Sequence, residues 1–79
     1  MPRTVTIYGR PECCLCVEAM EVLLSVQKEV PFTIEKKDIT LDPVLESRYR
    51  FSIPVIHIDG AFAFKHRVTA VDILSRLRD

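Results

Sequence analysis

Residues 5–20 read VTIYGRPECCLCVEAM and join an apolar, β-branched run to a helical one. The run 4–8 is rich in β-branched and aromatic residues and stops at the turn-forming residues 9–11, which predicts a strand that ends in a turn. Residues 14–29 contain neither proline nor glycine, and apolar residues recur there at helical spacing. The cysteines are therefore expected where a first strand gives way to the longest helix.

The segment that follows completes a βαβ unit. Val30 and Pro31 break the helical pattern, and residues 32–39 begin with the alternation that predicts a second strand. Such units are right-handed and carry parallel strands, so the cysteines are expected at the carboxyl end of the first strand, where open sheets place their chemistry. The helix between the strands is expected to bury one apolar stripe, made of Cys16, Ala19, Met20, Leu23, Leu24 and Val26.

The second half of the chain predicts a helix, a hairpin and a final helix. Asp42 is a suitable N-cap before Pro43, which opens a short helix to about residue 49. Two β-rich runs, 55–58 and 61–64, are joined by an Asp-Gly pair typical of two-residue hairpin turns. Residues 69–72 resemble a capping box and precede a last amphipathic helix. The predicted order is βαβαββα, an α/β fold with one four-stranded mixed sheet and helices on both faces.

Length and composition predict one small globular domain over residues 1–79. The chain has 79 residues, of which 48% are hydrophobic and 28% charged, and it contains no low-complexity tract. Its 11 basic and 11 acidic residues cancel, which argues against a nucleic-acid partner. No run approaches the ~20 apolar residues of a membrane span, and no signal-peptide pattern opens the chain. We therefore expect a cytoplasmic monomer with neither a nucleic-acid nor a membrane partner.

The three cysteines are crowded into four positions, Cys13 to Cys16. An odd number of thiols so close together cannot staple distant segments, so a structural disulfide framework is not expected. In the reducing cytosol, a Cys-x-x-Cys pair is typical of redox activity or metal binding. The rotation of about 100° per residue in a helix makes Cys13 and Cys16 neighbours and turns Cys14 away, so the reactive pair is predicted to be Cys13 with Cys16.

The two paired thiols are predicted to have different tasks. Cys13 falls at the cap of the helix, where unpaired N–H groups and the helix dipole favour a thiolate, and Arg10 adds positive charge nearby. Cys16 lies one turn deeper on the apolar stripe, so burial is expected to raise the pKa of its thiol. The resulting hypothesis is that Cys13 attacks a disulfide and that Cys16 resolves the mixed disulfide formed.

The segment 5–20, together with Ser52, Ile53 and Pro54, resembles the glutaredoxins, which belong to the thioredoxin superfamily. The resemblance covers essentially the whole chain and implies a thioredoxin-like fold in its minimal glutaredoxin form. It also implies a thiol–disulfide oxidoreductase with a redox-active disulfide between the first and last cysteines of the motif. In the family a cis-proline faces the cysteines and the preceding residue pairs with the substrate, which implies that Pro54 is cis and that Ile53 contacts the substrate.

The sequence departs from the glutaredoxin pattern in two places. The usual Pro-Tyr between the cysteines is replaced by Cys14 and Leu15, and the glycine pair that precedes the glutathione-binding turn is replaced by the basic run 65–67. The start of the last helix at Thr69 is a candidate carboxylate site beside this run, and the alternative is an ordinary solvated basic turn. The chain therefore resembles most closely the short glutaredoxin-like proteins of unassigned physiological function.

These observations predict the partners and leave two rival functions. We expect no tightly bound cofactor and no bound metal, with glutathione or a thioredoxin-type reductase as the source of electrons. Disulfide-containing or glutathionylated proteins are the expected substrates. A small copper or zinc carrier could use the same Cys-x-x-Cys, although the fold of such carriers ends with a strand. A noncatalytic interaction module with the thioredoxin fold is the other alternative.

Overall fold

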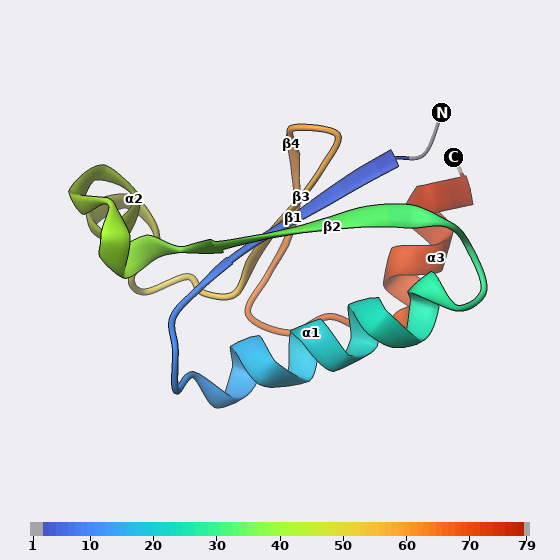
Figure 1. The fold of residues 1–79 in the computed structure, drawn as a ribbon, viewed down its shortest axis with the longest axis horizontal. Coiled ribbons are helices and arrows are strands. Elements are labelled where there is room, and N and C mark those ends of the chain that lie inside the picture. The colour runs from blue at the N-terminus through green and yellow to red at the C-terminus, as the bar shows by residue number, and fades with distance from the viewer. Residues whose placement is uncertain (1–2, 79) are drawn as a thin grey trace.

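The computed structural model describes residues 3–78, and its elements follow the predicted order βαβαββα (Figure 1). A short 3₁₀ helix, η1, follows the second strand and was not expected from the sequence. The second strand accordingly ends one residue earlier than predicted, and the first helix ends two residues earlier. The elements are β1 (Arg3–Gly9), α1 (Cys14–Gln27), β2 (Phe32–Asp38), η1 (Ile39–Leu41), α2 (Pro43–Tyr49), β3 (Val55–Ile58), β4 (Ala61–Lys65) and α3 (Ala70–Arg78).

The strands form one mixed sheet in the order β2-β1-β3-β4. β1 pairs with β2 in parallel along its whole length, from Arg3 opposite Phe32 to Gly9 opposite Asp38. The pairings of β1 with β3 and of β3 with β4 are antiparallel. β1 is therefore a central strand, and its carboxyl end leads directly into the loop that ends at Cys13, the N-cap of α1.

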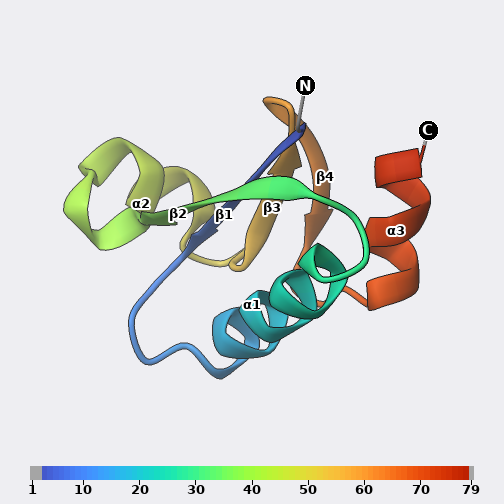
Figure 2. The ribbon, with the colours of Figure 1, turned by 45° about the vertical axis from the view of Figure 1, so that its right-hand side comes forward.

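The helices α1 and α3 lie together against one face of the sheet (Figure 2). The side chains of Val5 and Ile7 point to this face and are almost completely buried, as are Leu23 of α1 and Ile73 of α3. One hydrophobic core therefore joins both helices to the sheet. Leu24 is an exception to the predicted stripe, because its side chain is 49% exposed on the flank of α1 that turns away from the sheet.

The short helix α2 lies on the opposite face, at one end of the sheet. None of its residues is buried. It contacts the sheet through Tyr49, whose ring lies 5.1 Å from that of Tyr8 and 6.2 Å from that of His57. Tyr8 alternates with the core residues of β1, so it belongs to the face that α1 does not cover. The prediction of helices on both faces is confirmed, and α2 is held mainly by aromatic contacts.

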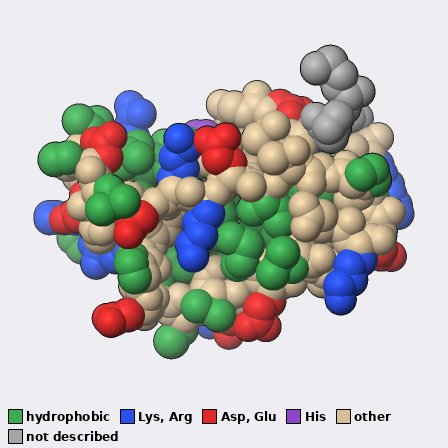
Figure 3. Space-filling model, viewed as in Figure 1, with side chains coloured by type: hydrophobic (Ala, Val, Ile, Leu, Met, Phe, Trp, Pro, Cys, Tyr) green, Lys and Arg blue, Asp and Glu red, His purple; other side chains and the backbone are tan. Residues whose placement is uncertain are grey.

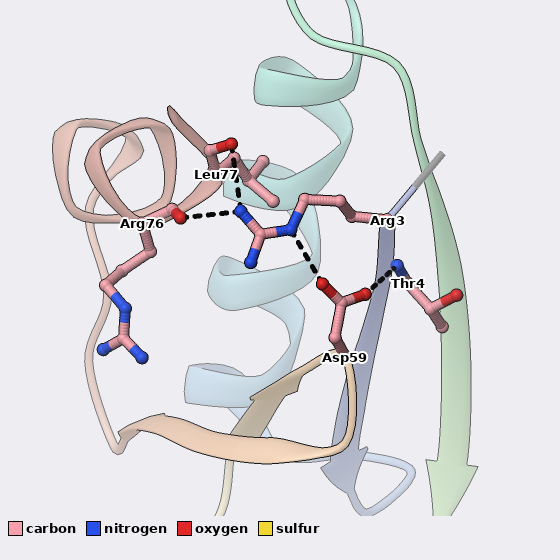
Figure 4. Close-up of polar contacts among 5 residues, drawn as sticks. All are labelled: Arg3, Thr4, Asp59, Arg76 and Leu77. Atoms are coloured by element: carbon pink, nitrogen blue, oxygen red, sulfur yellow. Dashed lines mark hydrogen bonds and ion pairs between the residues drawn. The ribbon is translucent and has the colours of Figure 1, made fainter. Parts of the chain in front are cut away.

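Polar contacts tie the far end of the sheet together (Figure 4). Arg3 donates from Nε to Asp59 Oδ2 at 2.8 Å and from Nη1 to the carbonyls of Arg76 and Leu77 at 3.0 and 3.1 Å. The other carboxylate oxygen of Asp59 accepts the backbone N–H of Thr4 at 3.0 Å. Arg3 therefore satisfies carbonyls at the end of α3 while holding the hairpin turn against β1.

The caps and the hairpin turn are those that the sequence predicts. Asp42 accepts hydrogen bonds from the N–H groups of the second and third residues of α2. Thr69 and Asp72 exchange the two hydrogen bonds of a capping box at the start of α3. Asp59 and Gly60 both have positive φ, 52° and 85°, as a type I′ hairpin turn requires. Among residues 3–78, no helix is long and apolar enough to cross a membrane.

Candidate active site

The loop between β1 and α1 sets the position of Cys13. Glu12 lies in the left-handed region with φ of 67°, which turns the chain sharply out of the strand. Cys13 then has the extended geometry of an N-cap, with φ −90° and ψ 115°, and its carbonyl accepts the N–H of Val17 at 3.0 Å. The first cysteine of the motif therefore caps α1, as the sequence predicts.

The sulfur of Cys13 receives a hydrogen bond from the helix that it caps. The backbone N–H of Cys16 donates to Cys13 Sγ at 3.3 Å. A sulfur in this position accepts from an N–H group that has no partner within the helix, at the positive end of the helix dipole. Cys13 is half-buried, whereas Cys16 is buried. The geometry suits a nucleophile at the less covered of the two paired positions.

Cys16 has the opposite environment. Its side chain is buried, with 8% exposure. Burial, followed by the hydrogen bond with Cys13, raises the pKa of Cys16 from 9.0 to about 11, against a smaller lowering by the backbone of Arg10. The predicted burial and raised pKa of Cys16 are both confirmed. The pair consists of a half-buried cysteine whose sulfur accepts a hydrogen bond and a buried cysteine that keeps its proton at neutral pH.

Gly9 at the end of β1 makes room for Cys16. A Cβ atom placed on Gly9 would lie 2.7 Å from Cys16 Sγ and 3.2 Å from Cys16 Cβ. Contacts below 3.0 Å essentially never occur for real Cβ atoms, so no other residue fits here unless Cys16 moves. The sequence predicts only a turn at Gly9, and the structure shows that its lack of a side chain lets α1 approach the strand.

The third cysteine does not join the pair. Cys14 is exposed, whereas Cys16 is buried, so the three thiols do not converge. Within residues 3–78, no three side chains of histidine, cysteine, aspartate or glutamate are grouped so that they could hold a metal ion. The pairing of Cys13 with Cys16 therefore stays the geometrically favoured one.

The peptide bond between Ile53 and Pro54 is cis, as the resemblance implies. Pro54 is buried at the start of β3, and its carbonyl accepts the N–H of His66 at 2.8 Å. The ring Nε2 of His66 lies 3.0 Å from the carbonyl oxygen of Phe51. Residues 50–54 join α2 to β3, and we call them the cis-proline loop. His66 therefore attaches the loop after β4 to the cis-proline loop at two points.

Comparison with known proteins identifies the family. The family model for the glutaredoxin-like domain (DUF836) matches residues 4–78. The chain belongs to the glutaredoxin-like family. A glutaredoxin-like protein of Dictyostelium discoideum is 33% identical over 70 residues, which cover 81% of this chain and 65% of that protein. The chain thus spans just under two thirds of the length of this curated relative.

Solved structures similar to this glutaredoxin-like protein support the same assignment. An NMR structure of a Nitrosomonas europaea protein has a TM-score of 0.84 and 26% identity and covers 98% of this chain and 93% of its own. A crystal structure of an X. campestris protein has a TM-score of 0.81 and 26% identity, covering 94% and 95%. Thioredoxin-2 of the malaria parasite, at 17% identity, has a TM-score of 0.74 with coverage of 98% and 82% and shows the thioredoxin-like fold alone.

The basic turn of this glutaredoxin-like protein has an unusual backbone. His66 adopts a φ of 67°, a conformation that glycine takes without strain. The structure therefore combines a left-handed backbone at this turn with a side chain that contacts the cis-proline loop. No spacing in the sequence points to these contacts of His66.

Arg10 lies beside the pair, on the loop between β1 and α1. Its Nε atom is buried and has no hydrogen-bond partner among the residues that the structure describes. It lines a mainly apolar pocket of about 210 Å³ between α1 and the end of β2, together with Cys16 and Lys36. A guanidinium N–H can donate a hydrogen bond to an anionic group of a ligand, which is the role predicted for Arg10.

Thr69 has a different surrounding from the one expected of a carboxylate site. Its N–H donates to the carboxylate of Asp72 at 3.3 Å, and its hydroxyl accepts the N–H of Asp72 at 3.2 Å. Both groups are therefore used by the capping box of α3, and the nearby carboxylate adds negative charge. Ile53 is half-buried beside Pro54.

Proposed function

We propose that this protein is a cytoplasmic thiol–disulfide oxidoreductase in which Cys13 is the nucleophile and Cys16 the resolving thiol. The observation that carries the proposal is the asymmetry of the pair. Cys13 is half-buried and its Sγ accepts the N–H of Cys16 at 3.3 Å, whereas Cys16 is buried with its pKa raised to about 11. Membership of the glutaredoxin-like family supports the same chemistry.

The first step is attack on the substrate disulfide. The Cys13 thiolate forms a bond to one sulfur of the substrate, and the bond between the two substrate sulfurs breaks. The departing sulfur leaves as a thiolate, so charge is conserved. The N–H of Cys16 and the helix dipole stabilise the anion before attack. The product is a mixed disulfide between Cys13 and the substrate.

The second step releases the substrate. Cys16 gives up its proton and attacks Cys13 Sγ, which forms the Cys13–Cys16 disulfide and breaks the bond to the substrate. The departing substrate thiolate takes up a proton. Two electrons have then passed from the cysteine pair to the substrate. The dithiol is restored by two thiols of a reductant, for which glutathione or a thioredoxin-type reductase is the proposed source.

The substrate is proposed to lie along the cis-proline loop. Ile53 offers its backbone to an extended segment, as the family resemblance implies, and Pro54 forms the wall beside it. Arg10 supplies a cation with an unpaired Nε, and Thr69 holds the start of α3 in place next to the loop. Disulfide-containing or glutathionylated proteins are the proposed substrates. The protein is proposed to act as a monomer without a tightly bound cofactor.

A single-turnover assay on cysteine variants tests this function. The pre-reduced protein is mixed with a protein disulfide or with a glutathione mixed disulfide, and the thiols released are measured. We expect Cys13→Ser to release none, Cys14→Ser to match the wild type, and Cys16→Ser to stop at the mixed disulfide with a protein substrate. Full activity in Cys13→Ser together with loss in Cys14→Ser would contradict the assignment.

A further inference from the structure

A group of exposed cationic and aromatic side chains lies on the cis-proline loop and on the turn after β4. We call it the basic ledge, and it consists of Arg50, Phe51, Lys65, His66 and Arg67. All five residues are exposed, and the side chain of Phe51 is 82% exposed. The chain as a whole has no net charge, so this concentration of cations is local. The roles proposed above for the cysteines do not explain it.

Hydrogen bonds join the two segments that carry the ledge. The N–H of His66 donates to the Pro54 carbonyl at 2.8 Å, and the His66 ring lies 3.0 Å from the carbonyl oxygen of Phe51. The N–H of Arg67 donates to the carbonyl of Lys65 at 2.9 Å, which keeps the turn tight. The charged residues on either side of His66 therefore have a defined place relative to Pro54.

The ledge also reaches the first turns of α1. A pocket of about 150 Å³ separates the turn at His66 and Arg67 from Leu15, which lies between the last two cysteines of the motif. Glu18 lines the same pocket and is the carboxylate that faces Arg67 from α1. Asp72, which accepts the N–H of Thr69, is a second nearby carboxylate, whereas the ledge itself contains three permanent cations and no acidic residue.

At its other end the ledge meets α2. The guanidinium of Arg50 lies over the ring of Phe51, with Cζ 4.7 Å from the ring centroid. Such a pair presents an apolar surface and a cation together. Leu41 and Val44 are also exposed at this end of the molecule, where hydrophobic side chains stand among charged ones (Figure 3). This combination suits a protein segment that carries both apolar and acidic side chains.

We propose that the basic ledge selects protein substrates in which acidic residues flank the disulfide. The inference rests on the proposed function, since it assigns a substrate class to the same site. Acidic side chains would pair with Lys65 and Arg67 while the disulfide lies between the cis-proline loop and Cys13. Complementary charge at the rim of a site acts mainly on the rate of association and weakens with added salt.

Three matched peptides that share one disulfide loop test the proposal. Their flanking residues are acidic, neutral or basic, and single-turnover reduction is followed at low and at moderate ionic strength. We expect the acidic peptide to react on the order of tenfold faster than the basic one at low ionic strength, with the ratio falling as salt is added. The double variant Lys65→Gln, Arg67→Gln should bring the three rates together.

A control variant with the same change in net charge is Lys28→Gln, Arg78→Gln. Lys28 follows the end of α1 and Arg78 ends α3, both far from the cysteines, so this variant should keep the preference. If the wild-type protein reduced the three peptides at equal rates, or if the preference survived in Lys65→Gln, Arg67→Gln, the proposal for the ledge would be overturned. The proposed oxidoreductase function would not be affected by either result.

Binding of serine-for-cysteine versions of the peptides is measured in parallel by NMR shifts of the backbone amides. The acidic version should move the amides of His66 and Arg67, and the basic version should not. If no peptide is reduced, the proposed oxidoreductase function is wrong, and the NMR shifts alone then show whether the ledge prefers acidic peptides. Identical shifts with all three peptides, or none at these residues, would overturn it.

Discussion

Replacing Gly9 with alanine tests the contact that places Cys16 against β1. The new Cβ atom would lie 2.7 Å from Cys16 Sγ. Unstrained contacts between carbon atoms are about 3.5–4.0 Å, so Cys16 must retreat by roughly 1 Å. Both groups are buried, and the sulfur belongs to a short side chain on a helix, so the movement must involve α1 itself. Gly9→Ala therefore displaces the resolving thiol of Cys16 from its place against β1.

The expected cost has a structural and a catalytic part. Overpacking of a buried contact costs about 1–3 kcal/mol, so the free energy of unfolding should fall by that amount. Misplacing a reacting group by about 1 Å slows a positioned reaction by up to about a hundredfold. We therefore expect attack by Cys13 at nearly the wild-type rate and resolution by Cys16 slowed by about tenfold to a hundredfold.

Two measurements separate these parts. Urea denaturation gives the free energy of unfolding of Gly9→Ala in wild-type and Cys16→Ala backgrounds, and the cost should be about 1 kcal/mol smaller without the sulfur. Rapid acid quench gives the rates at which the mixed disulfide forms and disappears. Gly60→Ala is the matched control, since φ of 85° makes it strained by about 1 kcal/mol although nothing lies within 4 Å of its added Cβ.

If Gly9→Ala resolved the mixed disulfide as fast as the wild type, Gly9 would not control the position of Cys16. The same conclusion would follow if Gly60→Ala slowed resolution equally, because the effect would then depend on stability and not on the position of Cys16. An unchanged cost of Gly9→Ala in the Cys16→Ala background would show that the sulfur is not the atom that the new methyl group meets.

Three further predictions concern titration and capping. Burial raises the pKa of Cys16 from 9.0 to about 11, so its neutral thiol stabilises the fold below pH 9.0 and this contribution is lost toward pH 11. Between these pH values the free energy of unfolding, measured by denaturation, should fall by about 2–3 kcal/mol more in the reduced wild type than in Cys16→Ala. The hydrogen bond from the Thr4 N–H and, after it, the one from Arg3 lower the pKa of Asp59, so the carboxylate stabilises the fold above pH 3.8 and this contribution is lost as pH falls. The free energy of unfolding should therefore fall less steeply with decreasing pH in Asp59→Asn than in the wild type, and equal slopes would contradict this. Asp42→Ala should cost about 1 kcal/mol and fray α2 in hydrogen exchange without changing the cysteine chemistry, since no residue of α2 is buried; unchanged protection in α2 would contradict it.

Most of the fold could be predicted because local signals agreed with the tertiary structure. The Asp42 cap, the Asp59-Gly60 turn and the capping box at Thr69 each depend on neighbouring residues only, and each is present in the structure. The extra turn at η1 was missed because Ile39 is buried, as a strand residue would be, while the chain bends there through Asp38, which accepts the N–H of Thr40. Leu24 was misplaced because helical spacing alone does not fix the width of the buried face.

The active site could be predicted only in part. The positions of Cys13 and Cys16 follow from helix geometry, which a local sequence contains. The close approach of Gly9 to Cys16 and the contacts of His66 with the cis-proline loop depend on segments far apart in the chain. Sequence spacing carries no information on such contacts. The left-handed conformation of His66 was unexpected because a side chain normally disfavours it, and its two contacts with the loop offset that cost.

Peptide mapping of the oxidised protein tests directly whether Cys13 and Cys16 form the redox-active pair. The reduced protein is treated with one equivalent of a mild oxidant, free thiols are alkylated, and the disulfide is located by mass spectrometry. The account predicts a Cys13–Cys16 disulfide with Cys14 alkylated, and recovery of three free thiols after reduction. A disulfide that includes Cys14, or three alkylated cysteines after oxidation, would contradict it.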